Sequence, residues 1–115
     1  MRYLLLCCVD EKDWDAMPAP QRDGIMREYG ELLRDLDNSG HHLASARLQS
    51  TSTATTVRGG SGKTFVTDGP YAETKEQLGG YHLVECRDLH EAIAIAKRIP
   101  TLPYGGTVEV RPLST

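Results

Sequence analysis

The sequence has few cysteines, no excess of positive charge and no long hydrophobic run. Its three cysteines, two of them adjacent at Cys7 and Cys8, do not make a disulfide framework. The formal net charge is −3 without any basic cluster, so we expect binding neither to nucleic acid nor to an anionic membrane. The first apolar run, about seven residues before Asp10, is too short for a membrane span or a signal peptide. We therefore predict a reduced, cytoplasmic protein.

The spacing of ligands typical of metal sites is also lacking. None of the histidines stands with a Cys-x-x-Cys pair, the arrangement found in zinc sites, so we expect no metal and no cofactor. His41 and His42 are predicted to lie at a turn, and His90 at the exposed start of a helix. His82 is the histidine best placed on a strand, and we expect it to face the core or a helix.

The segment "GGSGKT" at residues 59–64 ends like a phosphate-binding loop, but its context does not fit one. A Walker motif needs an earlier glycine at the position that Val57 occupies here. The segment also runs into β-forming residues and then into Asp68-Gly69-Pro70, which excludes the helix that a phosphate loop enters. The interpretation that fits both flanks is a β-hairpin with a glycine-rich turn.

Hydrophobic periodicity predicts an α+β fold in a single domain that spans residues 1–115. One apolar stripe at helical period lies within residues 25–36, after an irregular entry over residues 14–20, and a second helix follows the capping box formed by Asp88 and Glu91. Strands are predicted near residues 3–9, 41–49, 79–86 and 106–113, with the hairpin between the second and third of them. This order is a ferredoxin-like βαββαβ plait with an inserted β-hairpin.

The first strand suggests a second copy of the chain as a partner. Residues 3–9 are apolar on both faces of the strand, although two helices can cover only one face of the sheet. Packing two uncovered faces together across a two-fold axis would form a dimeric α+β barrel. We therefore expect a homodimer.

The connection "DGPYAETKEQLGG" at residues 68–80 is short, charged and strongly constrained. Its Asp-Gly-Pro start and Gly-Gly end restrict the backbone more than a loose loop needs, and constrained loops on a rigid sheet often carry sites. The longer segment "TDGPYAETKEQLGGYHLVEC" closely resembles the signature of the YCII-related proteins, in the branch named for its Asp-Gly-Pro-Phe motif. Tyr71 stands where that branch usually has phenylalanine. The resemblance extends over nearly the whole chain, including "YLLLCCVDE", "TATTVR" and "GTVEVRPL".

The resemblance implies a dimeric α+β barrel and several possible functions. Relatives with this fold include isomerases and a dehydrochlorinase that acts on lactones. Members of the branch are often encoded beside extracytoplasmic-function sigma factors, which implies regulation linked to a sigma factor. A His–Asp pair has been proposed as catalytic in other YCII-related proteins, but the sequence offers no good counterpart of that pair here.

Two kinds of function fit these residues. A cofactor-free lyase or isomerase needs a carboxylate or histidine base and a donor for the developing oxyanion. For this chemistry the candidate bases are Asp68 and Glu73, and the candidate electrophilic partners are Lys75 and Arg111. The alternative is a non-catalytic module, which holds a small carbonyl, carboxylate or lactone compound or docks a regulatory protein such as a sigma factor.

We expect the charged residues of the loop and of the last strand to converge on one polar pocket. Glu109 and Arg111 project from one face of that strand, and Arg111 is expected to pair with a loop carboxylate, Glu73 before Glu76. The predicted ligand-binding residues are Tyr71, Lys75, Glu109 and Arg111. A closed network of ion pairs that only stabilises the loop is the alternative interpretation.

Overall fold

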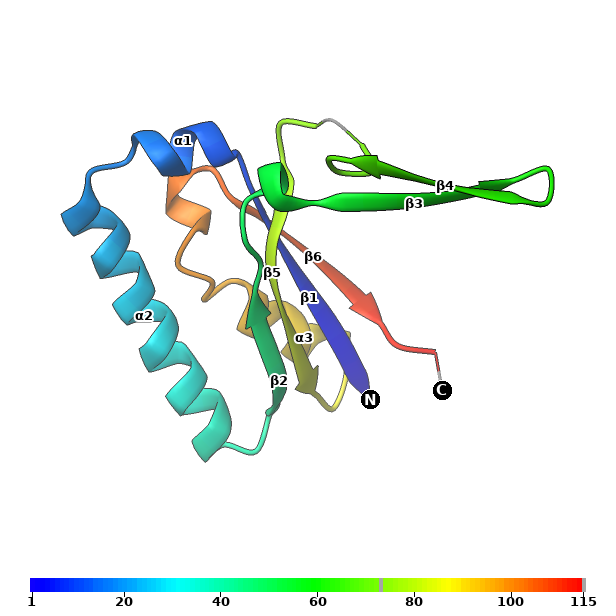
Figure 1. The fold of residues 1–115 in the computed structure, drawn as a ribbon. Helices are drawn as coiled ribbons and strands as arrows, with labels where there is room; N and C mark the ends of the chain where they lie inside the picture. Colours follow the sequence, from blue (N-terminus) through cyan, green and yellow to red (C-terminus); the bar gives the residue numbers. More distant parts are fainter. Residues whose placement is uncertain (73, 115) are drawn as a thin grey trace.

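The main structural unit is a four-stranded antiparallel sheet with helices on one face (Figure 1). The computed structural model describes residues 1–72 and 74–114. The strands of this sheet are β1 (Arg2–Val9), β2 (His42–Arg47), β5 (Gln77–Glu85) and β6 (Thr107–Pro112), in the order β2-β5-β1-β6. Every neighbouring pair is antiparallel. The order and connections confirm the predicted ferredoxin-like α+β fold.

The hydrophobic core lies between the sheet and two helices, α2 (Ala19–Asn38) and α3 (Leu89–Ala96). Alternate residues of β1 point into it, and Leu5 at its centre is completely buried. Leu32 and Leu36 of α2 and Ile95 of α3 pack against this face. Asp88 caps α3 by accepting a hydrogen bond from the Glu91 amide at 2.9 Å, which confirms the predicted capping box. The molecule is only 18 Å thick in its smallest dimension, as expected for one sheet and one layer of helices.

A short helix, α1 (Glu11–Ala16), stands where the sequence indicated an irregular entry from Trp14 to Pro20. That expectation was wrong for Trp14 to Ala16, which are in α1, and for Ala19 and Pro20, which begin α2. Asp10 caps the helix by accepting a hydrogen bond from the Lys12 amide at 2.9 Å, and the first turn carries two acidic residues. Because the segment has no apolar stripe, periodicity could not reveal it. The helix matters because it fixes Trp14 at the edge of the cavity described below.

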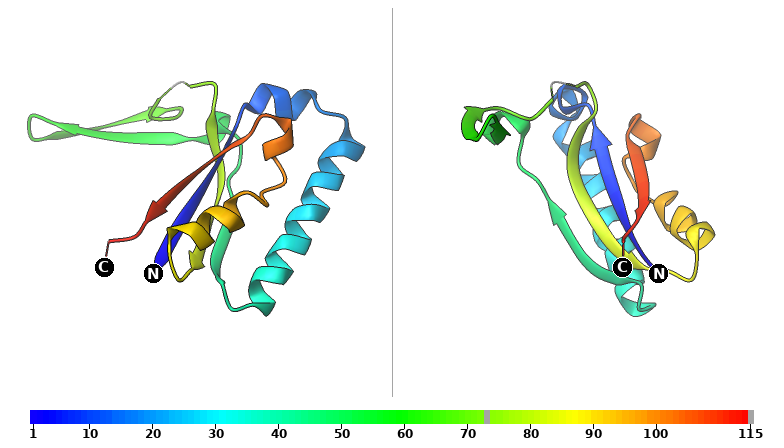
Figure 2. Two further views of the ribbon diagram at one scale, coloured as in Figure 1. Left: turned by 180° about the vertical axis from the view of Figure 1, so that it is seen from behind. Right: turned by 90° about the vertical axis from the view of Figure 1, so that its right-hand side faces the viewer.

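The inserted hairpin forms a sheet of its own, β3 (Thr55–Gly60) and β4 (Lys63–Asp68), and projects away from the main body (Figures 1 and 2). Ser61 and Gly62 form its turn, with φ values of 50° and 74°. The "GGSGKT" segment is therefore a solvent-exposed hairpin turn, as predicted. Two short 3₁₀ helices, η1 (Thr51–Thr53) and η2 (Leu102–Tyr104), complete the secondary structure within the described ranges. None of the helices in residues 1–72 and 74–114 is long and apolar enough to cross a membrane.

The β2–β5 pairing depends on a close approach at Gly80. A Cβ atom on Gly80 would lie 2.9 Å from the carbonyl oxygen of Ala46, whereas a Cβ atom on the adjacent Gly79 would find only ordinary contacts, the nearest at 3.6 Å. We expect Gly80→Ala to lower the free energy of unfolding by about 1–3 kcal/mol, because β2 must move away from β5. Gly79→Ala is the matched control and should change it by about 0.5 kcal/mol or less. Urea unfolding monitored by circular dichroism measures both, and equal losses in the two variants would contradict the expectation.

Candidate functional site

A cavity of about 630 Å³ opens between the sheet and α2, next to α1. This volume lies within the range of small-molecule sites in proteins. The lining is mainly apolar and aromatic, with a few polar groups set into the wall. Cys7, Trp14, Tyr29, Ser45, Arg47 and His82 are part of this lining.

A chain of hydrogen bonds runs from this wall to the surface. Asp37 Oδ1 lies 2.6 Å from His42 Nδ1, and His42 Nε2 lies 2.7 Å from Ser45 Oγ. Ser45 Oγ in turn lies 2.6 Å from His82 Nδ1. Asp37 belongs to the last turn of α2, His42 and Ser45 to β2, and His82 to β5. Four side chains from three elements are thereby joined in one line.

A β-bulge in β2 brings two of these side chains to the same face of the sheet. His42 pairs with Val84, and the register then shifts so that Ala44 pairs with Leu83 and Ser45 with His82. In a regular strand, residues three apart point to opposite faces. The extra residue of the bulge reverses this relation, so both His42 and Ser45 face α2.

The groups at the buried end of this chain of hydrogen bonds are uncharged. Burial lowers the pKa of His82, and the neighbouring His42 lowers it further. Burial also raises the pKa of Tyr29 to about 12, although a hydrogen bond with Thr101 opposes the shift. Burial is likewise the main cause that raises the pKa of Cys7 to about 11. Since the rings of His82 and Tyr29 stack with centroids 5.8 Å apart, a neutral base and a neutral acid lie side by side in the wall.

Arg47 brings a positive charge to the rim. Its guanidinium lies 5.5 Å from the centre of the Trp14 ring, a cation–π distance. Glu11, also at the rim, is occupied by hydrogen bonds from the Thr51 amide at 2.9 Å and the Thr51 hydroxyl at 2.8 Å. Within residues 1–72 and 74–114, Arg47 makes no ion pair with a carboxylate.

Of the residues predicted from the loop, Asp68, Tyr71 and Lys75 are not part of the cavity lining. Asp68 ends β4 and is exposed, opposite Thr55 in the hairpin, and Lys75 is exposed as well. Tyr71 is 76% exposed and lies under Arg58, whose guanidinium is 5.2 Å from its ring and donates a hydrogen bond to its carbonyl oxygen at 3.0 Å. Glu73 is outside the described residues. The catalytic roles of Asp68 and Glu73 and the ligand-binding roles of Tyr71 and Lys75 stay predictions.

Glu109 and Arg111 lie on the face of the sheet that the helices leave uncovered. Arg111 Nε is 3.5 Å from Glu109 Oε2, and both side chains are more than 60% exposed. The expected pairing of Arg111 with Glu73 stays a prediction, since Glu73 is not described. Glu109 and Glu76 both raise the pKa of Cys8, after the larger effect of burial. The end of the loop and β6 thus share the surroundings of Cys8.

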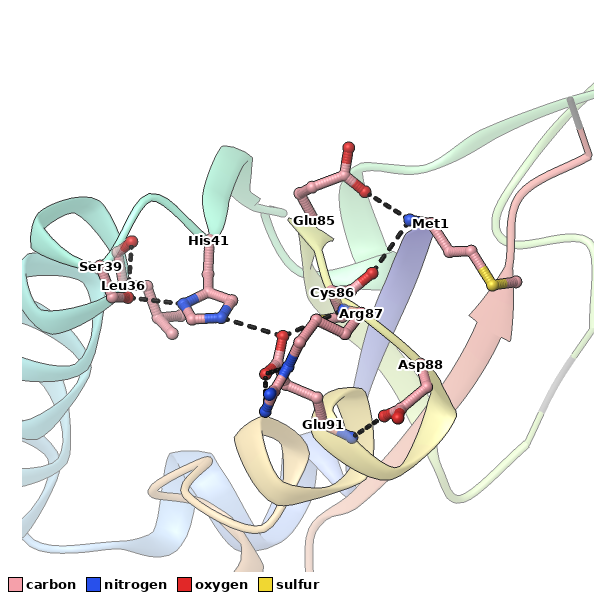
Figure 3. A network of polar contacts seen from close by, with 9 residues as sticks. All are labelled: Met1, Leu36, Ser39, His41, Glu85, Cys86, Arg87, Asp88 and Glu91. Carbon is pink, nitrogen blue, oxygen red and sulfur yellow. Dashed lines mark hydrogen bonds and ion pairs between the residues drawn. The ribbon is translucent and has the colours of Figure 1, made fainter.

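A second polar network joins the start of α3 to the end of α2 (Figure 3). Glu91 is its centre: its carboxylate lies 3.1 Å from His41 Nε2 and accepts hydrogen bonds from the Arg87 amide at 3.1 Å and from Arg87 Nε at 2.7 Å. His41 Nδ1 lies 2.6 Å from Ser39 Oγ. These contacts lower the pKa of Glu91, the Arg87 amide first among them. Ser39, His41 and Glu91 also line a second, more open cavity of about 590 Å³ beside α2 and α3. Because the contacts connect secondary-structure elements, we interpret the network as structural.

The predicted positions of the histidines agree with the structure for His82 and differ from it for His42. His82 is 7% exposed and faces the helices, as expected. His42 was predicted to lie at a turn, but it is the first residue of β2; its side chain is 19% exposed and is hydrogen-bonded on both nitrogens. Asp37 and Ser45 were missed, because alternation along β2 does not reveal the bulge that places Ser45 beside His42.

The Glu91 network predicts a specific loss of stability in acid. A carboxyl with a lowered pKa stabilises the folded state above its unfolded value, here 4.5, and this contribution disappears as the pH falls through the folded pKa. Glu91→Gln should therefore lower the melting temperature near pH 7, and the difference from the wild type should shrink below pH 4.5. Glu28→Gln, at an exposed position of α2, is the control and should have little effect at either pH. If the difference in melting temperature between Glu91→Gln and the wild type stays constant from about pH 7 to about pH 3, this interpretation is contradicted.

Comparison with known proteins identifies the family of the chain. The family model of the YCII-related domain matches residues 1–115. An uncharacterized protein of Rhizobium meliloti (strain 1021) is 39% identical over 115 residues, which cover 99% of this chain and 93% of that protein. The family match, the similarity to that protein and the ferredoxin-like fold agree, and the chain belongs to the YCII-related family.

Proposed function

We propose that this protein binds a small carbonyl, carboxylate or lactone compound in the cavity between the sheet and α2. The observation that carries the proposal is the neutral hydrogen-bonding wall of His82, Ser45 and Tyr29 inside an otherwise apolar cavity of about 630 Å³. Apolar pockets with a few fixed polar groups are typical of small-molecule sites. The proposal moves the site from the Asp68–Glu76 loop to the helix-covered face of the sheet.

The charges at the rim favour a ligand with a carboxylate. Arg47 lines the cavity and pairs with no described carboxylate, whereas Glu11 is already bound to Thr51. A guanidinium can hold a carboxylate by two parallel hydrogen bonds. Deeper in the cavity, the neutral wall suits a carbonyl oxygen or a lactone ring, because these groups need hydrogen bonds and carry no charge.

Trp14 gives a direct readout of binding, since it is the one tryptophan of the chain and lies at the cavity. We expect aromatic carboxylates, 2-oxo acids or lactones to change its fluorescence on titration. Arg47→Met should lower the affinity for carboxylates about 10- to 100-fold, because a charge-assisted hydrogen bond contributes about 1.5–3 kcal/mol. Neutral lactones should bind about equally to both proteins.

Arg58→Met is the matched control for this titration. Arg58 is also an exposed arginine that lies over an aromatic ring, but it belongs to the projecting hairpin. Its replacement should leave the carboxylate affinities unchanged. The proposal would be abandoned if no compound of the three classes changes the fluorescence of Trp14. It would also be abandoned if the two arginine variants lower the affinity for carboxylates equally.

We also propose that two copies of the chain pack through the uncovered face of the sheet. On this face, Leu4 of β1 pairs with Leu83 of β5 and Arg111 of β6. Leu6 of β1 pairs on the same face with Tyr81 of β5 and Glu109 of β6. An apolar surface of this kind is typical of an interface between subunits. In such a dimer, Glu109 and Arg111 would face the partner, and the loop with Asp68, Tyr71 and Lys75 would lie near it.

Light scattering tests the dimer. We expect a mass of twice 12.7 kDa at micromolar concentration. Leu6→Glu should shift the protein toward the monomer, because it places charges at the centre of the interface. Leu89→Glu is the control, since Leu89 is 49% exposed at the start of α3, on the helix side. A monomeric wild type, or equal dissociation by both variants, would rule out this interface.

A further inference from the structure

We propose that His82, Ser45, His42 and Asp37 form a proton relay in which His82 removes a proton from a compound bound in the cavity. The relay would transfer the positive charge to His42, next to the surface. This inference rests on the proposed function, because the base needs an occupied cavity. It adds an activity to that function: proton abstraction from a carbon next to a carbonyl group.

The direction of the hydrogen bonds follows from the partners. A carboxylate only accepts, so His42 Nδ1 must carry the proton that it shares with Asp37 at 2.6 Å. In a neutral His42, Nε2 then has a free lone pair, and the Ser45 hydroxyl donates to it at 2.7 Å. Ser45 has a single proton, so its oxygen must accept from His82 Nδ1 at 2.6 Å. His82 Nε2 is therefore the unprotonated nitrogen of its ring.

That nitrogen is reachable from the cavity. His82 Nε2 makes no hydrogen bond with residues 1–72 or 74–114. Among the same residues, every fully buried side-chain nitrogen or oxygen has a hydrogen-bond partner. His82 Nε2 is thus not fully buried, and His82 lines the cavity. A base with a free lone pair toward a ligand site meets the geometric requirement for proton abstraction.

Exposure is lowest at His82 and highest at Asp37. His82 is 7% exposed as a residue, and the side chains of His42 and Asp37 are 19% and 60% exposed. Three groups that share the cavity wall with His82 are uncharged at neutral pH: Tyr29 from α2, Cys7 from β1 and Thr101 before η2. Arg47, which also lines the cavity, is a cation and cannot stabilise a positive charge on His82. A positive charge on His82 would therefore be costly, whereas on His42 it lies beside the Asp37 carboxylate.

The proposed step conserves atoms and electrons. The C–H bond of the ligand breaks, its proton goes to His82 Nε2, and the electron pair moves onto the carbonyl oxygen to form an enolate. His82 Nδ1 passes its proton to Ser45, and Ser45 passes its own to His42 Nε2. The reverse sequence returns a proton to carbon. The net result is isotope exchange with solvent or a shift of the double bond, without oxidant or reductant.

Phenylpyruvate is a suitable probe, because it combines an aromatic ring, a carboxylate and an acidic C–H group next to a ketone. In D₂O, the wild type should speed up the exchange of its C3 protons, followed by NMR. At phenylpyruvate concentrations that saturate each protein, as followed by Trp14 fluorescence, Ser45→Ala should slow this exchange about tenfold or more. Ser45→Thr keeps the hydroxyl and should restore the exchange. Ser39→Ala removes another serine–histidine hydrogen bond of 2.6 Å, outside the cavity, and should have no effect.

The two readouts separate the relay from the proposed function. If phenylpyruvate leaves Trp14 unperturbed, its binding has failed. If it binds without accelerated exchange, or if Ser45→Ala exchanges as fast as the wild type, the relay is wrong and the binding proposal stands.

A second measurement tests the relay without any ligand. The nitrogen-15 spectrum of the histidine rings at neutral pH should show His42 and His82 both protonated at Nδ1 and bare at Nε2. Ser45→Ala should release His82 toward the Nε2-protonated form that is common in free histidine, and Ser39→Ala should leave it unchanged. An Nε2-protonated His82 in the wild type would overturn the proposal whether or not phenylpyruvate binds.

Discussion

The pairing of β2 with β5 is the constraint on which the cavity and its polar wall depend. The lack of a side chain at Gly80 lets the two backbones approach closely, and the bulge next to His42 sets which side chains face α2. Without the bulge, Ser45 would point to the opposite face of the sheet, and the two histidines could not share one hydroxyl. A register shift of a single residue thus decides whether the wall contains a connected set of polar groups or isolated ones.

The sequence predicted the fold well because its signals are local or periodic. The apolar stripe of α2, the Asp88–Glu91 cap and the glycine-rich turn each depend on a few neighbouring residues, and each is present in the structure. The helix α1 escaped notice because it is short and polar and is fixed by the Asp10 cap. Its existence follows from capping, and no hydrophobic pattern accompanies it.

The candidate site could be predicted only in part, for a different reason. His82 was recognised as a helix-facing strand residue, but its partner Ser45 comes from a strand that is remote in sequence, and the contact exists only in one bulged register. Sequence patterns indicate which face a residue occupies and give no information on a bulge in a strand with weak alternation. The constrained loop attracted attention through its unusual composition, but Asp68 and Lys75 lie in exposed positions. Composition marks a segment as special without showing what it contacts.

His42 lies beside the C-terminus of α2, and this position affects where a positive charge is stabilised in this protein. The last turn of α2 contains no basic residue, and Asp37 adds a carboxylate there, 2.6 Å from His42 Nδ1. The macrodipole of a helix places a partial negative charge at its C-terminus, which disfavours an acidic side chain there and favours a cation. An imidazolium at His42 would offset both negative contributions at once. Positive charge is therefore disfavoured in the cavity wall and favoured at the C-terminus of α2, the longest helix. In the proposed relay, a proton that leaves the neutral wall reaches the end of α2 at which the backbone attracts positive charge.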